Sequence, residues 1–202
     1  MTLDRFRSVA DRVIVPFVAG AARIGLTPNA VSTLAFLVAA AAGGTFYLAG
    51  ETPMLYLVGA VLVLLNGLLD LLDGALAREL GTASKAGDLL DHVLDRYADI
   101  VIIVGLAGGI DDWRLGIAAV TGVLMTSYLG TQAQAVGIDR VYGGLLGRAD
   151  RLVLVGLVAV VAPFVTGALG PFTLVGWLLV VFAVVGHLTA VQRFYYSMRS
   201  LS

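Results

Sequence analysis

Residues 70–95 read DLLDGALARELGTASKAGDLLDHVLD, and the rest of the chain is organised around this stretch. It holds four carboxylates, Asp70, Asp73, Asp91 and Asp95, in a sequence that is otherwise mostly apolar. Like charges that lie close together cannot all stay ionised unless protons or cations neutralise them. The stretch therefore predicts a bound cation or a cationic partner.

The composition around this stretch is that of a membrane protein. Of the 202 residues, 59% are hydrophobic and only 13% are charged, and the mean hydropathy is +0.94, whereas about a quarter of the residues in a soluble domain are charged. The absence of Cys excludes disulfides, thiolate metal sites and Cys nucleophiles. No basic patch supports a nucleic-acid partner.

Six apolar runs follow the N-terminal segment, and each of them except the fifth approaches the ~20 residues that a helix needs to cross ~30 Å of hydrocarbon. The runs lack the alternation of barrel strands, and backbone polar groups cannot go unpaired in lipid, so helices are expected. The sequence thus predicts an all-α membrane protein with a six-helix transmembrane bundle over residues 30–191. The expected spans are 30–49, 54–76, 89–109, 115–136, 152–166 and 172–191.

Residues 1–24 predict a juxtamembrane amphipathic helix that lies in the interface, because arginines run through the whole apolar segment. A signal peptide would have a compact apolar core and a small-residue cleavage site. The other interpretation is a frayed tail. No further domain is expected, so residues 1–202 form one integral-membrane domain.

The basic residues predict the orientation. Six spans place both termini and the second and fourth loops on one side, which collects every Lys and Arg except Arg114. Positive charge marks the cytoplasmic side, so we expect a multi-pass protein of the cell membrane with both termini and residues 70–95 facing the cytoplasm. The residues on that side are Arg5, Arg7, Arg12, Arg23, Arg78, Lys85, Arg96, Arg140, Arg148, Arg151, Arg193 and Arg199.

The spacing of the carboxylates favours a hard divalent ion. Asp70 and Asp73 share one helix face, as do Asp91 and Asp95 on the next helix, and a short connection turns the two pairs toward each other. Oxygen ligands without a His or Cys pattern favour Mg²⁺, with Mn²⁺ a second choice, and four carboxylates suit two ions. The alternative is an interfacial cap of solvated charges on two helix ends.

The residues between the two pairs indicate phosphate chemistry. Gly74 and Ala77 are small where a ligand would approach the helix, and Gly87 keeps the facing helix thin. Arg78 can bind a phosphate through two parallel hydrogen bonds. A dication together with an Arg recurs where a diphosphate is neutralised during transfer.

The stretch resembles the signature of the CDP-alcohol phosphotransferase family, DxxDGxxAR followed by eight residues and GxxxDxxxD. The resemblance implies a six-helix fold, a cytoplasmic active site, a homodimer, and transfer of a phosphoalcohol group from a CDP-linked lipid to a hydroxyl with release of CMP. The filled positions are Asp70, Asp73, Gly74, Ala77, Arg78, Gly87, Asp91 and Asp95.

The resemblance also implies residue roles. Asp70, Asp73 and Asp91 would bind two Mg²⁺ ions with Asp95 nearby, and Asp95 would be the general base that takes the acceptor's proton. Residues 26–32, LTPNAVS, are similar to the opening of the first span in these enzymes, although Thr27 and Pro28 also form an ordinary helix start. The implied CDP-lipid contacts are Asn29, Ala30, Val31, Ser32, Gly74, Ala77, Arg78, Ser84 and Gly87.

The acceptor side resembles the branch that makes phosphatidylinositol phosphate or its archaeal ether-lipid counterpart. Arg148, Arg151 and Arg193 match basic residues that form a phosphate pocket there, with membrane anchoring as the alternative for these arginines. Gly130 and Gln132 depart from that branch, where Lys and Arg are typical. Gln132 is kept as an acceptor contact; inositol phosphate is the expected acceptor and glycerol phosphate the alternative.

Two other functions use similar residues. An intramembrane prenyltransferase also combines Asp-rich motifs with Mg²⁺ but would carry two separate motifs on a longer chain. A cation transporter would need polar residues along a path through the membrane, whereas the charges here lie near one face. Asn66, Asp88 and Asp99 lie close to the motif carboxylates and could orient them or pair with Arg96. Any apolar groove accepts ester-linked or ether-linked lipid chains, so the donor lipid stays open.

Overall fold

The structure is a computed structural model that describes residues 7–138, 144, 146–165 and 167–201, with side chains from residue 14 onward. Arg5, Arg140 and Thr166 of the expectations above lie outside the described residues. Within that part of the chain there is no strand, only an isolated antiparallel bridge between Leu169 and Phe172. The expected all-α class is therefore confirmed. The helices are α1 Arg7–Arg23, α2 Pro28–Leu48, α3 Leu55–Glu79, α4 Lys85–Gly109, α5 Trp113–Ala135, α6 Arg148–Val161, the short 3₁₀ helix Ala162–Phe164, and α7 Leu174–Leu201.

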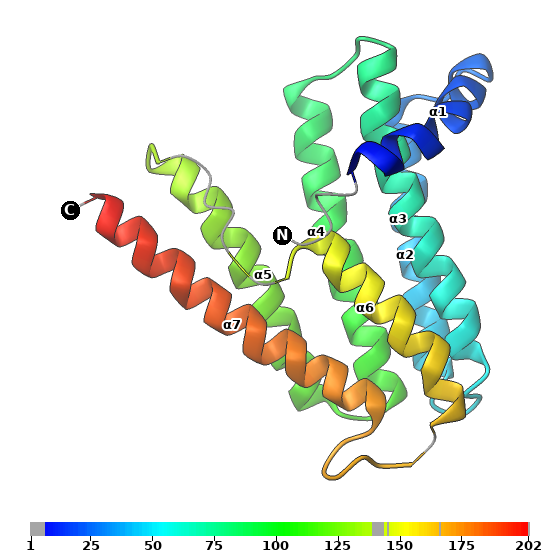
Figure 1. Cartoon of the computed structure of the whole chain (residues 1–202), viewed down its shortest axis with the longest axis vertical. Helices are drawn as coiled ribbons and strands as arrows, with labels where there is room; N and C mark the ends of the chain where they lie inside the picture. The colour runs from blue at the N-terminus through cyan, green and yellow to red at the C-terminus, as the bar shows by residue number, and fades with distance from the viewer. Residues whose placement is uncertain (1–6, 139–143, 145, 166, 202) are drawn as a thin grey trace.

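The chain reverses direction at each connection from α2 to α7 (Figure 1). The α3–α4 connection and the end of α7 lie on the upper side of the view, and the α2–α3, α4–α5 and α6–α7 connections lie on the lower side. α2 packs against both α3 and α4, α5 packs against α7, and α6 packs mainly on α3. The α5 and α7 pair leans away from the other helices toward the upper side, where the site described below is built.

Caps, rather than the apolar runs, set the starts of α2 and α4. The Oγ1 atom of Thr27 accepts a hydrogen bond from the backbone N–H of Ala30 at 3.3 Å. The Oγ atom of Ser84 accepts one from the N–H of Gly87 at 3.1 Å, so α4 begins at Lys85 rather than near residue 89. Hydropathy follows the lipid boundary, whereas a helix continues into water until a cap ends it.

Three helices in the described part of the chain, α2, α3 and α7, are long and apolar enough to cross a membrane. α4 has the length for a span but carries several carboxylates along it. The chain therefore has the apolar helices of an integral membrane protein, and the six-span arrangement stays a prediction.

The contact between α2 and α4 depends on glycines. A Cβ atom on Gly105 of α4 would collide with the carbonyl oxygen of Gly43 in α2. Small residues at such contacts allow two helix backbones to approach closely, which favours packing in lipid.

One face of α1 packs against the bundle. Ile14, Val18 and Ala21 are buried with Val31 and Leu76, and α1 crosses the upper end of α3 (Figure 1). The four-residue and three-residue spacing of these positions is that of a single helix face. This placement brings α1 close to the end of α3 that carries the motif.

Candidate active site

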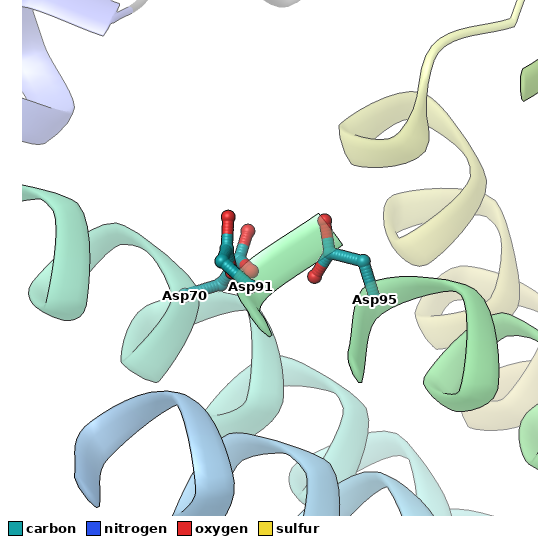
Figure 2. A group of neighbouring side chains, drawn as sticks. All are labelled: Asp70, Asp91 and Asp95. Carbon is teal, nitrogen blue, oxygen red and sulfur yellow. The ribbon is translucent and has the colours of Figure 1, made fainter. Parts of the chain in front are cut away.

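Three carboxylates converge between α3 and α4. Asp70, Asp91 and Asp95 each offer one oxygen, and the three oxygens lie within 4.8 Å of one another. Figure 2 shows Asp70 and Asp91 side by side, with Asp95 opposite them. Since α2 packs against both α3 and α4, it fixes the separation across which these side chains face each other.

Asp73 stands beside this group rather than in it. It is buried, and its Oδ2 atom accepts a hydrogen bond from the Oγ of Ser32 in α2 at 2.6 Å. All four motif aspartates nevertheless line one cavity of about 10 Å³. The structure thus brings the expected metal-binding set together as three converging carboxylates and a fourth that Ser32 holds.

Arg148, the first residue of α6, reaches the carboxylates. Its Nη1 atom lies 2.5 Å from Oδ2 of Asp70, and its Nη2 atom lies 2.9 Å from Oδ1 of Asp95. The sequence predicted Arg148 for the acceptor pocket and contained no signal that it would contact the metal-binding residues. This contact joins α6 to the site across a long interval of sequence.

The residues present fit a hard divalent ion. The oxygens of Asp70, Asp91 and Asp95 are close enough for one ion to touch all three, and carboxylates are the ligands that Mg²⁺ and Mn²⁺ prefer. Nearby, the Oδ1 atom of Asn66 is buried and accepts no hydrogen bond from the residues that the structure describes.

A larger cavity opens beside the carboxylates. It has a volume of about 420 Å³ and lies between the start of α2, the end of α3 and the start of α4. Seven of the nine residues expected to contact the CDP-lipid line it, and Asp73 and Asp91 border it. These seven are Asn29, Ser32, Gly74, Ala77, Arg78, Ser84 and Gly87.

The other two expected contacts lie elsewhere on α2. Ala30 is exposed and does not line this cavity, and Val31 is buried against Leu76 in the contact with α1. Thr82 and Ala83, which the motif leaves unspecified, do line the cavity. The α3–α4 connection is short, and this sequence signal could have predicted that Thr82 and Ala83 line the cavity.

A second set of ion pairs lies one turn further along α4 and α6. Asp99 is buried and accepts a hydrogen bond from Nη2 of Arg151 at 2.7 Å. Arg96 lies 3.5 Å from the same Asp99 oxygen and 3.7 Å from Asp95, and it also donates to the Oγ of Ser127 on α5. This set connects the three converging carboxylates to α5.

The other residues predicted for the acceptor pocket lie around α5. Arg193 of α7 is buried, and its Nη1 donates to the carbonyl oxygen of Thr126 at 2.7 Å. Thr126 shares a small cavity with Arg151, so the two arginines approach the same part of α5. Gln132 is half-buried further along α5, about 9 Å beyond Thr126 at 1.5 Å per residue.

An apolar groove of about 600 Å³ runs between α3 and α6. Its walls include Leu64, Leu68 and Leu157, and one end reaches Asp70 and Arg148. The groove therefore joins an apolar surface of the bundle to the converging carboxylates. Its shape and polarity suit hydrocarbon chains attached to a charged group.

These features fit a helical membrane protein with a site for a divalent ion beside a cavity and an apolar groove. The sequence model of CDP-alcohol phosphatidyltransferases matches residues 25–188. The chain belongs to the CDP-alcohol phosphatidyltransferase family and is a transferase of phosphate-containing groups. The family match decides against the prenyltransferase and transporter interpretations.

Two curated relatives are similar over most of the chain. Archaetidylinositol phosphate synthase of Methanothermobacter thermautotrophicus is 33% identical over 199 residues, which cover 96% of this chain and 93% of the relative. Phosphatidylinositol phosphate synthase of Mycobacterium tuberculosis is 34% identical over 195 residues, covering 93% and 86%. The predicted resemblance to this branch is confirmed.

Two crystal structures of the mycobacterial phosphatidylinositol phosphate synthase share the fold. The structure with CDP-DAG bound has a TM-score of 0.77 at 31% identity and covers 92% of this chain and 94% of that one. The structure with manganese and citrate has a TM-score of 0.76 at 31% identity and covers 91% and 88%. The carboxylate cluster and the manganese complex of this relative together indicate divalent-metal binding.

Proposed function

We propose that the protein transfers the phosphoalcohol group of a CDP-linked lipid to a hydroxyl of inositol phosphate and releases CMP. The observation that carries the proposal is the convergence of Asp70, Asp91 and Asp95 at the meeting point of the 420 Å³ polar cavity and the 600 Å³ apolar groove. The names of the two inositol phosphate lipid synthases and the CDP-DAG bound to one relative support the same reaction.

The donor half of the site would work as follows. The cytidine and diphosphate lie in the polar cavity, with Arg78 at the diphosphate and the small Gly74 and Ala77 leaving room for the nucleotide. The lipid chains lie in the apolar groove. A divalent ion, Mg²⁺ or Mn²⁺, would be held by the motif aspartates and would supply positive charge at the diphosphate; we propose two such ions.

The chemical step joins an acceptor oxygen to the lipid-side phosphorus. The new P–O bond forms as the P–O bond to the CMP phosphate breaks, and CMP leaves with that oxygen. Asp95 takes the proton of the acceptor hydroxyl as general base. Asp95 lies between Arg148 and Arg96, which is where an acceptor phosphate would bring its hydroxyl.

The acceptor phosphate would bind among Arg148, Arg151 and Arg193, with Gln132 near the entrance. Each of these arginines already has a protein partner, so a phosphate would share or exchange those partners. Gly130 and Gln132 favour a second candidate, glycerol phosphate, because they remove two expected cations from the pocket.

We further propose that residues 1–202 form one domain in the cell membrane as a homodimer. α2 to α7 would be its six spans, and α1 would lie at the cytoplasmic interface with the site and both termini on that side. The short connections and the packed face of α1 support this arrangement. Cysteine accessibility in intact cells would test the sidedness, and light scattering of the purified protein would test the dimer.

The function is tested with purified full-length protein, a CDP-lipid, Mg²⁺ or Mn²⁺, and inositol phosphate, glycerol phosphate, inositol or serine in parallel. We expect CMP release that requires the metal and is fastest with inositol phosphate. Faster release with glycerol phosphate would select the second candidate. Absence of CMP with every acceptor would refute the enzyme assignment.

A further inference from the structure

Asn66 is a fully buried polar residue on α3, one turn before Asp70. Its side chain is 1% exposed, and its Nδ2 donates to the carbonyl oxygen of Ala35 in α2 at 2.9 Å. Because only the amide NH₂ can donate to a carbonyl, this bond fixes which end of the amide faces α2. The other end of the amide, Oδ1, is buried, and no donor among the described residues reaches it.

The surroundings of Asn66 indicate which kind of donor its Oδ1 would accept a hydrogen bond from. Asn66 lines the same cavity of about 10 Å³ as Asp70, Asp91 and Asp95, and a space of about 10–15 Å³ holds one water molecule. A buried acceptor without a donor is costly, so an oxygen in this position calls for a hydrogen-bond donor.

We propose that Asn66 is a positioning residue of the metal site, whose Oδ1 accepts a hydrogen bond from a water ligand of the divalent ion at Asp70, Asp91 and Asp95. The inference rests on the proposed function, because it requires that ion. Mg²⁺ and its substitutes keep several water ligands, and residues that hold such ligands orient the ion. The Ala35 contact makes the amide rigid enough for this role.

The alternative is that Asn66 serves only to tie α3 to α2, as polar residues do between membrane helices. The two roles differ in what a substitution does to metal affinity. Thr126 provides the matched control, because its Oγ1 donates to the carbonyl oxygen of Gly186 at 2.8 Å and ties α5 to α7 away from the carboxylates. Thr126→Val therefore removes a comparable tie outside the metal site.

The experiment measures Mn²⁺ binding to the purified full-length protein by electron paramagnetic resonance, without substrate, and thermal unfolding in parallel. We expect Asn66→Leu to weaken Mn²⁺ binding about tenfold, as loss of a residue that orients a metal ligand does. Asn66→Asp should strengthen it, since a carboxylate is a better acceptor for the metal-bound water. Thr126→Val should lower the unfolding temperature and leave Mn²⁺ affinity at the wild-type value.

Two results would overturn the inference. One is a Mn²⁺ affinity of Asn66→Leu equal to that of the wild-type protein, with a loss of stability like that of Thr126→Val. That result would mean that Asn66 only links α3 to α2. The other is Mn²⁺ binding by Asn66→Asp that is equal to or weaker than that of the wild-type protein. This result decides the question if Asn66→Leu does not fold. Failure of the wild-type protein to bind Mn²⁺ or to release CMP would instead count against the proposed function.

Discussion

Removing the side chain of Arg148 should strengthen divalent-metal binding. The guanidinium and a metal ion use the same oxygens of Asp70 and Asp95, at 2.5 and 2.9 Å from Arg148. A hydrogen bond to a charged group contributes about 1.5–3 kcal/mol. A bound ion must break at least one of the two contacts that Arg148 makes with Asp70 and Asp95. At about 1.4 kcal/mol per tenfold, Arg148→Ala should bind Mn²⁺ about tenfold to about a hundredfold more tightly.

Mn²⁺ titration of the purified protein by electron paramagnetic resonance measures this effect. Arg114→Ala is the control for loss of one positive charge, because Arg114 is exposed and belongs to the start of α5, the end of that helix on the lower side of Figure 1. The same Arg148→Ala protein should turn over more slowly, because Arg148 also belongs to the proposed acceptor pocket. Unchanged or weaker Mn²⁺ binding in Arg148→Ala would refute the competition between the guanidinium and the ion.

Three further substitutions test the base, the helix contact and the acceptor pocket. Asp95→Asn should lower CMP release by at least about a hundredfold with CDP-lipid affinity nearly retained, and normal turnover would remove Asp95 as the base. Gly105→Ala should destabilise the protein by about 1–3 kcal/mol through collision with α2, whereas Gly44→Ala, with open space around it, should not; equal unfolding temperatures would contradict the packing argument. Gly130→Lys combined with Gln132→Arg should lower the KM for inositol phosphate, and an unchanged KM would place the acceptor phosphate elsewhere.

The candidate donor site was largely predictable from the sequence because the motif is local. Asp70 and Gly74 are one turn apart on one helix, and Gly87 and Asp91 are one turn apart on the next, so helical periodicity alone groups them. A short polar connection then turns the two helices toward each other. The structure places Gly74, Gly87 and Asp91 around one cavity, and Asp70 and Asp91 share the smaller cavity beside it.

Helix limits were less predictable, because hydropathy measures the preference for lipid rather than helix formation. α7 continues to Leu201, ten residues past the apolar run, and α4 starts at its Ser84 cap. The polar residues in these extensions are compatible with a helix in water. The same extension of α4 lengthens the wall of the 420 Å³ cavity.

By itself, the sequence determined the helical class, the membrane character and the grouping of the four motif aspartates, since each depends on composition or on spacing within a turn. Only the tertiary structure decided which of these aspartates converge, that Ser32 holds Asp73, and that Arg148 reaches Asp70 and Asp95. The physical reason is that these contacts depend on the packing of α2 and α6 against α3. No local pattern encodes the distance between helices that lie far apart in the chain.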